Sequence, residues 1–172
     1  MQRTDFSEFA CSVARTMNIV GEPWSPLILR DVFLGVTRFD KIQEDLGVPR
    51  KVLAQRLSTM VEQGVLERVP YRNGRMRFEY VMTNKGRDFV TSLIALMNWG
   101  DRWQSGPEGI PVRAIHTGCG GDVEAKLFCT CCGQSVTTDM VHAQAGPGAR
   151  IGKGTAVLGR FPNTATTEQL AE

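Results

Sequence analysis

Residues 37–64, TRFDKIQEDLGVPRKVLAQRLSTMVEQG, contain two short helical patterns separated by a Gly-Val-Pro turn. The first pattern starts at Thr37, the expected N-cap, and stops at Gly47. The second starts with Pro49 at its first helical position and stops at Gly64. Its apolar residues share one face, and the residues opposite that face, which should point outward, are Lys51, Gln55 and Ser58.

Helical patterns also precede this stretch. Residues 11–20 fit a helix that Gly21 ends, and residues 23–34 fit a second, more apolar helix that Gly35 ends. We expect the second of these to be the buried helix of the domain, because its apolar residues form one broad stripe.

After Gly64 the apolar period changes from helical to alternating, which predicts two strands in LERVPY and RMRFEYVM. Asn73-Gly74 between them is typical of a two-residue hairpin turn. One face of the second strand should carry Met76, Phe78 and Tyr80, and the other Arg75, Arg77 and Glu79. A last long helix is expected from near Thr83 to about Trp103.

Composition places the chain among soluble globular proteins, with 172 residues, 42% hydrophobic and 22% charged. No secretory signal or membrane-spanning stretch is evident, so we expect a cytoplasmic protein. The net charge is only +2, but residues 38–87 hold eleven basic and six acidic residues. This local excess favours an anionic partner.

Helix, short turn, helix and an Arg-rich hairpin is the order of a winged helix-turn-helix, whose second helix fits the major groove of DNA. The sequence therefore predicts a mainly α fold with a small β-hairpin wing. It also predicts contacts with double-stranded DNA through Arg38, Arg50, Lys51, Gln55, Arg56, Arg72, Arg75 and Arg77.

Residues 8–103 resemble the HxlR-type winged-helix transcription regulators, relatives of the MarR group. The features that match run from Cys11–Arg15, Gly21 and Trp24 through Leu27–Asp31, Arg38-Phe39, Val52-Leu53, Arg56-Leu57, Gly64, Arg68 and Tyr80 to Thr83 and Lys85-Gly86. The resemblance implies a homodimer that binds an inverted-repeat operator and whose subunit interface is formed by the N-terminal and last long helices. It makes Phe9, Val13, Leu93, Met97 and Trp99 candidate interface residues, with an ordinary core role as the alternative.

The resemblance also makes Cys11 a candidate redox-sensing thiol, since the matching cysteine is a thiol switch in some relatives. Ser12 departs from the proline that usually follows. A lone cysteine before an apolar helix is otherwise an inert, buried residue, so both interpretations stay open.

Four soft ligands follow the last helix in two matched pairs. His116 and Cys119, like Cys129 and Cys132, are separated by two residues and followed by glycine. This spacing predicts a closed, structural Zn²⁺ site in a zinc-ribbon-like lobe, and longer HxlR-type regulators look similar here. The alternatives are a disulfide, a redox thiol cluster, or Cys131 or His142 replacing one ligand.

The predicted organisation is a DNA-binding and dimerisation domain (1–104), a linker (105–112), the zinc-ribbon-like lobe (113–143) and a Gly-rich tail (144–172) that we expect to be mobile. No catalytic constellation is evident, so we expect a DNA-binding regulator and not an enzyme. A small-molecule effector is compatible with this interpretation. The alternative is a winged-helix module that docks proteins without specific DNA binding.

Overall fold

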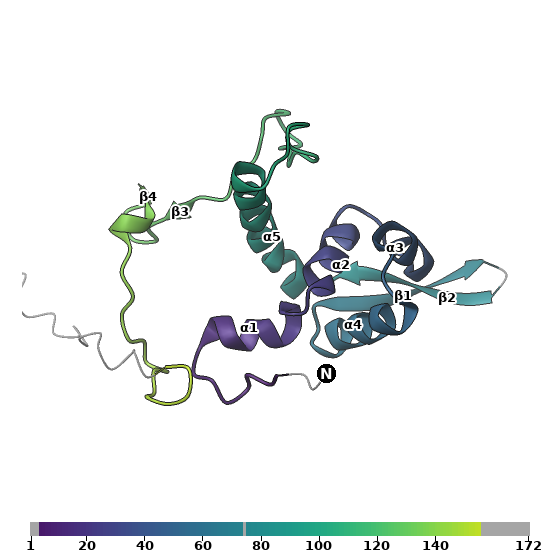
Figure 1. The fold of residues 1–172 in the computed structure, drawn as a ribbon, viewed down its shortest axis with the longest axis horizontal. Helices are drawn as coiled ribbons and strands as arrows, with labels where there is room; N and C mark the ends of the chain where they lie inside the picture. The colour runs from purple at the N-terminus through teal and green to yellow at the C-terminus, as the bar shows by residue number, and fades with distance from the viewer. Residues whose placement is uncertain (1–3, 74, 156–172) are drawn as a thin grey trace, which may run out of the picture. The chain divides into compact units, whose positions relative to one another are not determined.

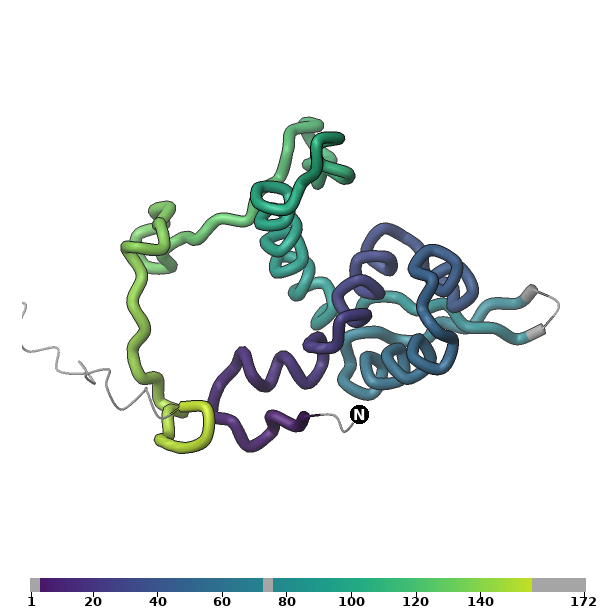
Figure 2. The backbone as a smooth tube through the Cα atoms, in the orientation of Figure 1, coloured from purple at the N-terminus to yellow at the C-terminus, as the bar shows by residue number. Residues whose placement is uncertain are grey.

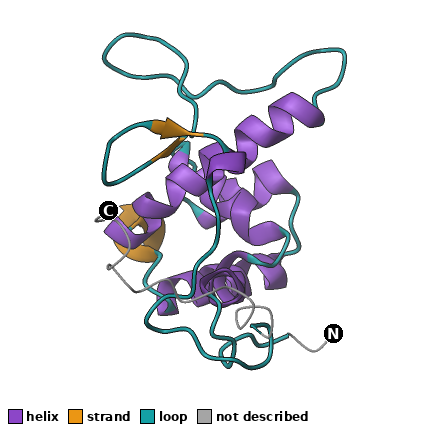
Figure 3. Ribbon diagram, turned by 90° about the vertical axis from the view of Figure 1, so that its left-hand side faces the viewer, coloured by secondary structure: helices purple, strands orange, loops and turns teal. Residues whose placement is uncertain are grey.

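The computed structural model describes residues 4–73 and 75–155. Among the described residues, those of 22–135 form one compact unit, and residues 4–21 and 136–155 belong to another. Loops make up most of the described chain beyond residue 103 (Figure 3). Among the described helices, none combines the length and hydropathy that a membrane crossing requires.

The first unit opens with the helices α2 (Trp24–Phe33), α3 (Phe39–Leu46) and α4 (Arg50–Glu62), as Figure 1 and the chain trace in Figure 2 show. An antiparallel hairpin of β1 (Leu66–Asn73) and β2 (Arg75–Met82) follows, and then the long helix α5 (Asn84–Trp103). A small second hairpin pairs β3 (Leu127–Phe128) with β4 (Ser135–Val136). The mainly helical fold with a small β-hairpin is confirmed.

One face of each of α2, α3 and α4 builds the core. The largest fully buried apolar side chains are Ile28, Leu29, Ile42, Val48, Leu53, Leu57, Met60 and Leu66. Because Leu53, Leu57 and Met60 lie on one side of α4, the opposite side of that helix faces solvent. Burial of this stripe therefore decides which α4 side chains are free to meet a partner.

The start of α3 differs from the sequence-based prediction. Its N-cap is Arg38 and not Thr37, whose carbonyl oxygen instead accepts a hydrogen bond from the Tyr80 N–H at 2.8 Å. This bond attaches the α2–α3 connection to β2, where the neighbouring Arg38 forms an antiparallel bridge with Glu79. Gly47 ends α3 as predicted, with a left-handed φ of 62°.

The hairpin register also differs from the prediction. Arg72 pairs with Met76 and Asn73 with Arg75, so the register is centred on residue 74. A two-residue Asn73-Gly74 turn would instead pair Arg72 with Arg75. This register changes which residues oppose one another near the hairpin tip.

The first turn of α5 is fixed to the end of α4. The Thr83 hydroxyl caps α5 by accepting from the Gly86 N–H at 3.2 Å, and it donates to the Gly64 carbonyl oxygen at 2.7 Å. The Lys85 ammonium donates to the Gln63 carbonyl oxygen at 2.7 Å. Gly86 is buried, and a Cβ at this position would run into the Val65 carbonyl oxygen.

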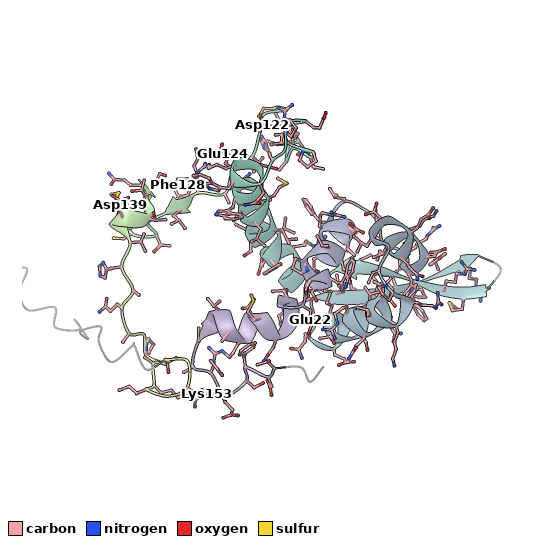
Figure 4. All side chains as sticks on the ribbon, in the orientation of Figure 1. Glu22, Asp122, Glu124, Phe128, Asp139 and Lys153 are labelled. Atoms are coloured by element: carbon pink, nitrogen blue, oxygen red, sulfur yellow. The ribbon has the colours of Figure 1, made fainter. Side chains whose placement is uncertain are left out.

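The other unit contains α1 (Ser12–Val20) and the 3-10 turn Thr138–Met140. The Arg150 guanidinium donates to the Glu8 carbonyl oxygen at 3.3 Å, and the Lys153 ammonium, labelled in Figure 4, lies 5.9 Å from the centre of the Phe9 ring. These contacts attach the start of the predicted Gly-rich tail to the N-terminal segment, while residues 156–172 lie outside the described residues.

Replacing Gly86 with alanine should lower the free energy of unfolding by about 1–3 kcal/mol, because the added Cβ forces α5 away from Val65. Gly100 of the same helix has open space around its Cα, so Gly100→Ala should leave stability unchanged or raise it by up to about 1 kcal/mol. Urea denaturation of both variants measures the difference. Equal stabilities of the two variants would show that α5 does not depend on this close contact.

Candidate nucleic-acid interface

The outward face of α4 carries three of the predicted DNA-contacting residues. Arg50, Lys51 and Gln55 are exposed, as their positions opposite the apolar stripe require. The first turn of α4 holds no acidic residue, and the helix N-terminus has a partial positive charge. The Arg50 guanidinium lies over the Phe39 ring, 4.8 Å from its centre. This end of α4 is suited to a phosphate or an electron-rich base edge.

The hairpin adds basic residues beside α4. Arg72 and Arg77 are exposed, and the Arg77 guanidinium lies 3.9 Å from the Asp40 carboxylate. The side chain of Arg75 lies outside the described residues. Arg77 and Arg50 line one open cleft together with Phe39, Asp40, Tyr71, Phe78 and Tyr80. The fold therefore brings the start of α4 and the hairpin onto one surface.

Arg38 holds the hairpin in place. Its Nε donates to the Glu79 carboxylate at 2.8 Å, and its guanidinium lies 4.6 Å from the centre of the Tyr71 ring. The hydrogen bond to Glu79 raises the pKa of Arg38 above its usual value. The residue is exposed and was predicted to contact DNA, and in the structure it joins the α2–α3 connection to both strands.

Arg56, which was predicted to contact DNA, is buried in the structure and does not belong to the exposed face of α4. Only 6% of its surface is accessible, and its Nη1 lies 3.7 Å from the Glu22 carboxylate, which Figure 4 labels. The reason is helical spacing, since Arg56 follows Leu53 by three positions and precedes Met60 by four. Its role in the structure is to pack and to pair, not to reach outward.

Cys11 forms the N-cap of α1 and is a half-buried free thiol. Redox sensing by Cys11 stays a prediction.

The four predicted zinc ligands lie in two separate pairs. His116 Nδ1 is 3.1 Å from the Cys119 sulfur. Backbone N–H groups of Cys132 and Cys131, with the Cys132 side chain, hydrogen-bond to Cys129 and lower the pKa of its thiol. Across residues 4–73 and 75–155, no three His, Cys, Asp or Glu side chains form a metal-binding group. Among the described residues, the ligand pairs of the two turns therefore do not come together into one metal-binding group.

Two apolar surfaces lie along α5. Leu93 and Met97 are half-buried and line a cavity of about 340 Å³ with α2 and residues 111–114, where most of the exposed lining is apolar. Leu96, Trp99 and Trp103 are 57%, 59% and 65% exposed and recur at positions i, i+3 and i+7. Trp99 was among the predicted interface residues, and Leu96 and Trp103, which share its exposed stripe, were not, although their spacing was visible in the sequence.

Three helices form the core, and a basic hairpin lies beside the exposed face of α4, the second helix of the helix-turn-helix. This arrangement defines the winged helix-turn-helix class of transcriptional regulators. A family model described as HxlR-like helix-turn-helix matches residues 19–107, which is more than half of the chain. The chain belongs to this family.

Similar proteins extend the match beyond that segment. An uncharacterised HTH-type transcriptional regulator of Mycobacterium tuberculosis strain H37Rv is 43% identical over 137 residues, which are 80% of this chain and 87% of that protein. The crystal structure of PA1607, a candidate transcription factor, covers 82% of this chain and 99% of its own at 33% identity, with a TM-score of 0.73. That of PA1374 from Pseudomonas aeruginosa, another candidate, covers 88% and 100% at 35% identity, with a TM-score of 0.58.

Arg56 provides a test of the buried pair. Glu22→Ala should lower the free energy of unfolding by about 1 kcal/mol, because it leaves the buried guanidinium without its carboxylate. Arg56→Met should cost less than Glu22→Ala, since a methionine of similar length needs no charged partner. Chemical denaturation measures both. A larger loss for Arg56→Met than for Glu22→Ala would show that the guanidinium itself stabilises the fold.

Proposed function

We propose that this chain is a homodimeric transcription regulator that binds a specific double-stranded DNA operator. The observation that carries the proposal is the shared surface of α4 and the hairpin, where Arg50 and Arg77 line one cleft. Two separate elements thereby present cations to the same partner. Membership of the HxlR-like family supports the proposal.

In this proposal α4 enters the major groove. Lys51 and Gln55 lie one helical turn apart on its exposed face, and both offer donors to base edges. Arg72 and Arg77 on the hairpin contact phosphates beside the groove, which adds affinity and salt dependence without reading sequence. The two elements therefore divide specificity and affinity between them.

A second copy of the chain covers the exposed seam of α5. Leu96, Trp99 and Trp103 repeat at the three- and four-residue spacing with which helices pair. Three large apolar side chains more than half exposed on one helix face are typical of an interface. The dimer gives two α4 helices and hence an inverted-repeat operator.

The cavity beside Leu93 and Met97 is the place where we expect a small apolar effector to bind, because its size and lining are typical of small-molecule sites. Thiol sensing by Cys11 is an independent prediction, and it requires that oxidation change DNA affinity in the parent but not in Cys11→Ser.

Lys51→Ala should weaken binding to the operator by about 1–3 kcal/mol while leaving binding to unrelated DNA nearly unchanged, because it removes a base-edge donor. Arg77→Ala should weaken binding to all sequences similarly and reduce the salt slope by about 1, because it removes a phosphate contact. Fluorescence anisotropy on DNA upstream of the chain's own gene, with an unrelated competitor, measures both.

The matched control is Arg102→Ala, which removes one positive charge from the last turn of α5. It should leave both affinities within about two-fold of the parent. If Lys51→Ala and Arg77→Ala also bound like the parent, the DNA-facing surface would be misplaced. Absence of competitor-resistant binding in the parent would favour a protein-docking module.

Trp99→Glu should convert the dimer to a monomer, because it places a charge in the apolar seam of α5. Thr91→Glu adds the same charge at an exposed position of α5 outside this seam and should leave the dimer intact. Sedimentation velocity at matched concentrations reports the mass. A dimeric Trp99→Glu variant would move the subunit interface away from this seam.

A further inference from the structure

The chain after α5 contains a tight turn at the tip of a short hairpin. The His116 N–H donates to the Gly121 carbonyl oxygen at 2.8 Å, and the Gly120 N–H donates back to the His116 carbonyl oxygen at 2.8 Å. Gly120 has a φ of 72°, a left-handed conformation that favours glycine. The turn places the side chains of residues i and i+3, His116 and Cys119, within 3.1 Å of each other.

A second turn repeats these two backbone hydrogen bonds at the same positions. The Cys129 N–H donates to the Gln134 carbonyl oxygen at 2.9 Å, and the Gly133 N–H donates back to the Cys129 carbonyl oxygen at 2.8 Å. Gly133 has a φ of 70°. Both turns therefore use a bond from residue i to residue i+5, a return bond from residue i+4, and a left-handed glycine after the second ligand.

We propose that His116, Cys119, Cys129 and Cys132 together bind one Zn²⁺ ion. Each turn supplies its residues i and i+3, and three thiolates with one imidazole complete a tetrahedral, closed site. Three thiolates and the ion carry a net charge of −1, which repels DNA phosphates. The site would therefore stabilise the structure of this segment and would not contact DNA.

The segment has a physical need for such a staple. Every described residue from 105 to 143 is exposed or half-buried, so the segment has no buried core of its own. Leu127 and Phe128 of β3 are 51% and 62% exposed. A segment of this size without a core of its own is typically stabilised by a metal or a disulfide.

Metal binding has to bring the two turns together, because the structure describes no group of three such ligands in residues 4–73 and 75–155. The first turn is anchored, since Arg113 pairs with both oxygens of Asp122, at 2.7 and 2.8 Å, and the Ala125 N–H donates to Asn98 of α5 at 2.9 Å. The segment that connects the two turns runs from Asp122 to Phe128, and Figure 4 labels both residues. We infer that the second turn moves toward the first.

The turn geometry also selects among the sulfur atoms. Cys131 occupies position i+2 of its turn, between the two positions that the first turn shows side by side. It is exposed and is the spare thiol in this arrangement. His142 lies outside both turns.

Metal analysis of the full-length chain, purified under reducing conditions without chelators, should give about one zinc per chain. Replacing the zinc with Co²⁺ should give the visible absorption of a tetrahedral thiolate site. Cys132→Ser should lose the Co²⁺ spectrum and most of the zinc. The matched control Cys131→Ser should keep both, and so should His116→Cys, which exchanges one ligand type for another.

The proposal would be overturned if the reduced chain took up less than about 0.2 zinc when offered an excess. It would also be overturned if Cys131→Ser lost the ion while Cys132→Ser kept it. A Cys129–Cys132 disulfide in the freshly isolated chain, with no zinc uptake after reduction, would also contradict the proposal. It would indicate that these cysteines form a redox pair and do not bind a metal. Because these readouts do not involve DNA, they are independent of the proposed regulatory function.

Discussion

Burial of Leu53, Leu57 and Met60 against α2 and α3 is the constraint on which the DNA-facing surface depends. A helix has only one way to bury such a stripe, so the burial also sets the direction of Arg50, Lys51 and Gln55. The same core holds the α2–α3 connection, from which Thr37 and Arg38 bond to the hairpin. The basic surface is therefore a consequence of packing on the opposite side of α4.

Local patterns predicted the helices and the outward face of α4 well, because glycines and apolar spacing act over a few residues. They failed where a contact crosses the fold. Thr37 bonds to β2 instead of capping α3, and the hairpin register is centred on residue 74. Arg56 was misassigned because its charge was given more weight than its spacing from Leu53 and Met60, which already indicated the buried side.

The candidate metal site shows the same division between local and long-range structure. Glycines after Cys119 and Cys132 predict two tight turns, and the structure has both with the same hydrogen bonds. Whether two turns meet depends on what lies between them and on any ion that joins them. Neither is encoded in a four-residue spacing, so the sequence indicates the ligand pairs more strongly than their assembly.

The attachment of α5 to the end of α4 bears on the spacing of operator half-sites that a dimer would prefer. Thr83 and Lys85 bond to the carbonyl oxygens of Gly64 and Gln63, and buried Gly86 leaves no room for slippage. The angle between α4 and α5 is thereby fixed within the chain. In a dimer joined through α5, the crossing angle of the two α5 helices then sets the distance between the two α4 helices. Substitutions along α5 would change the preferred spacing of half-sites, whereas substitutions on α4 would change the bases that are read.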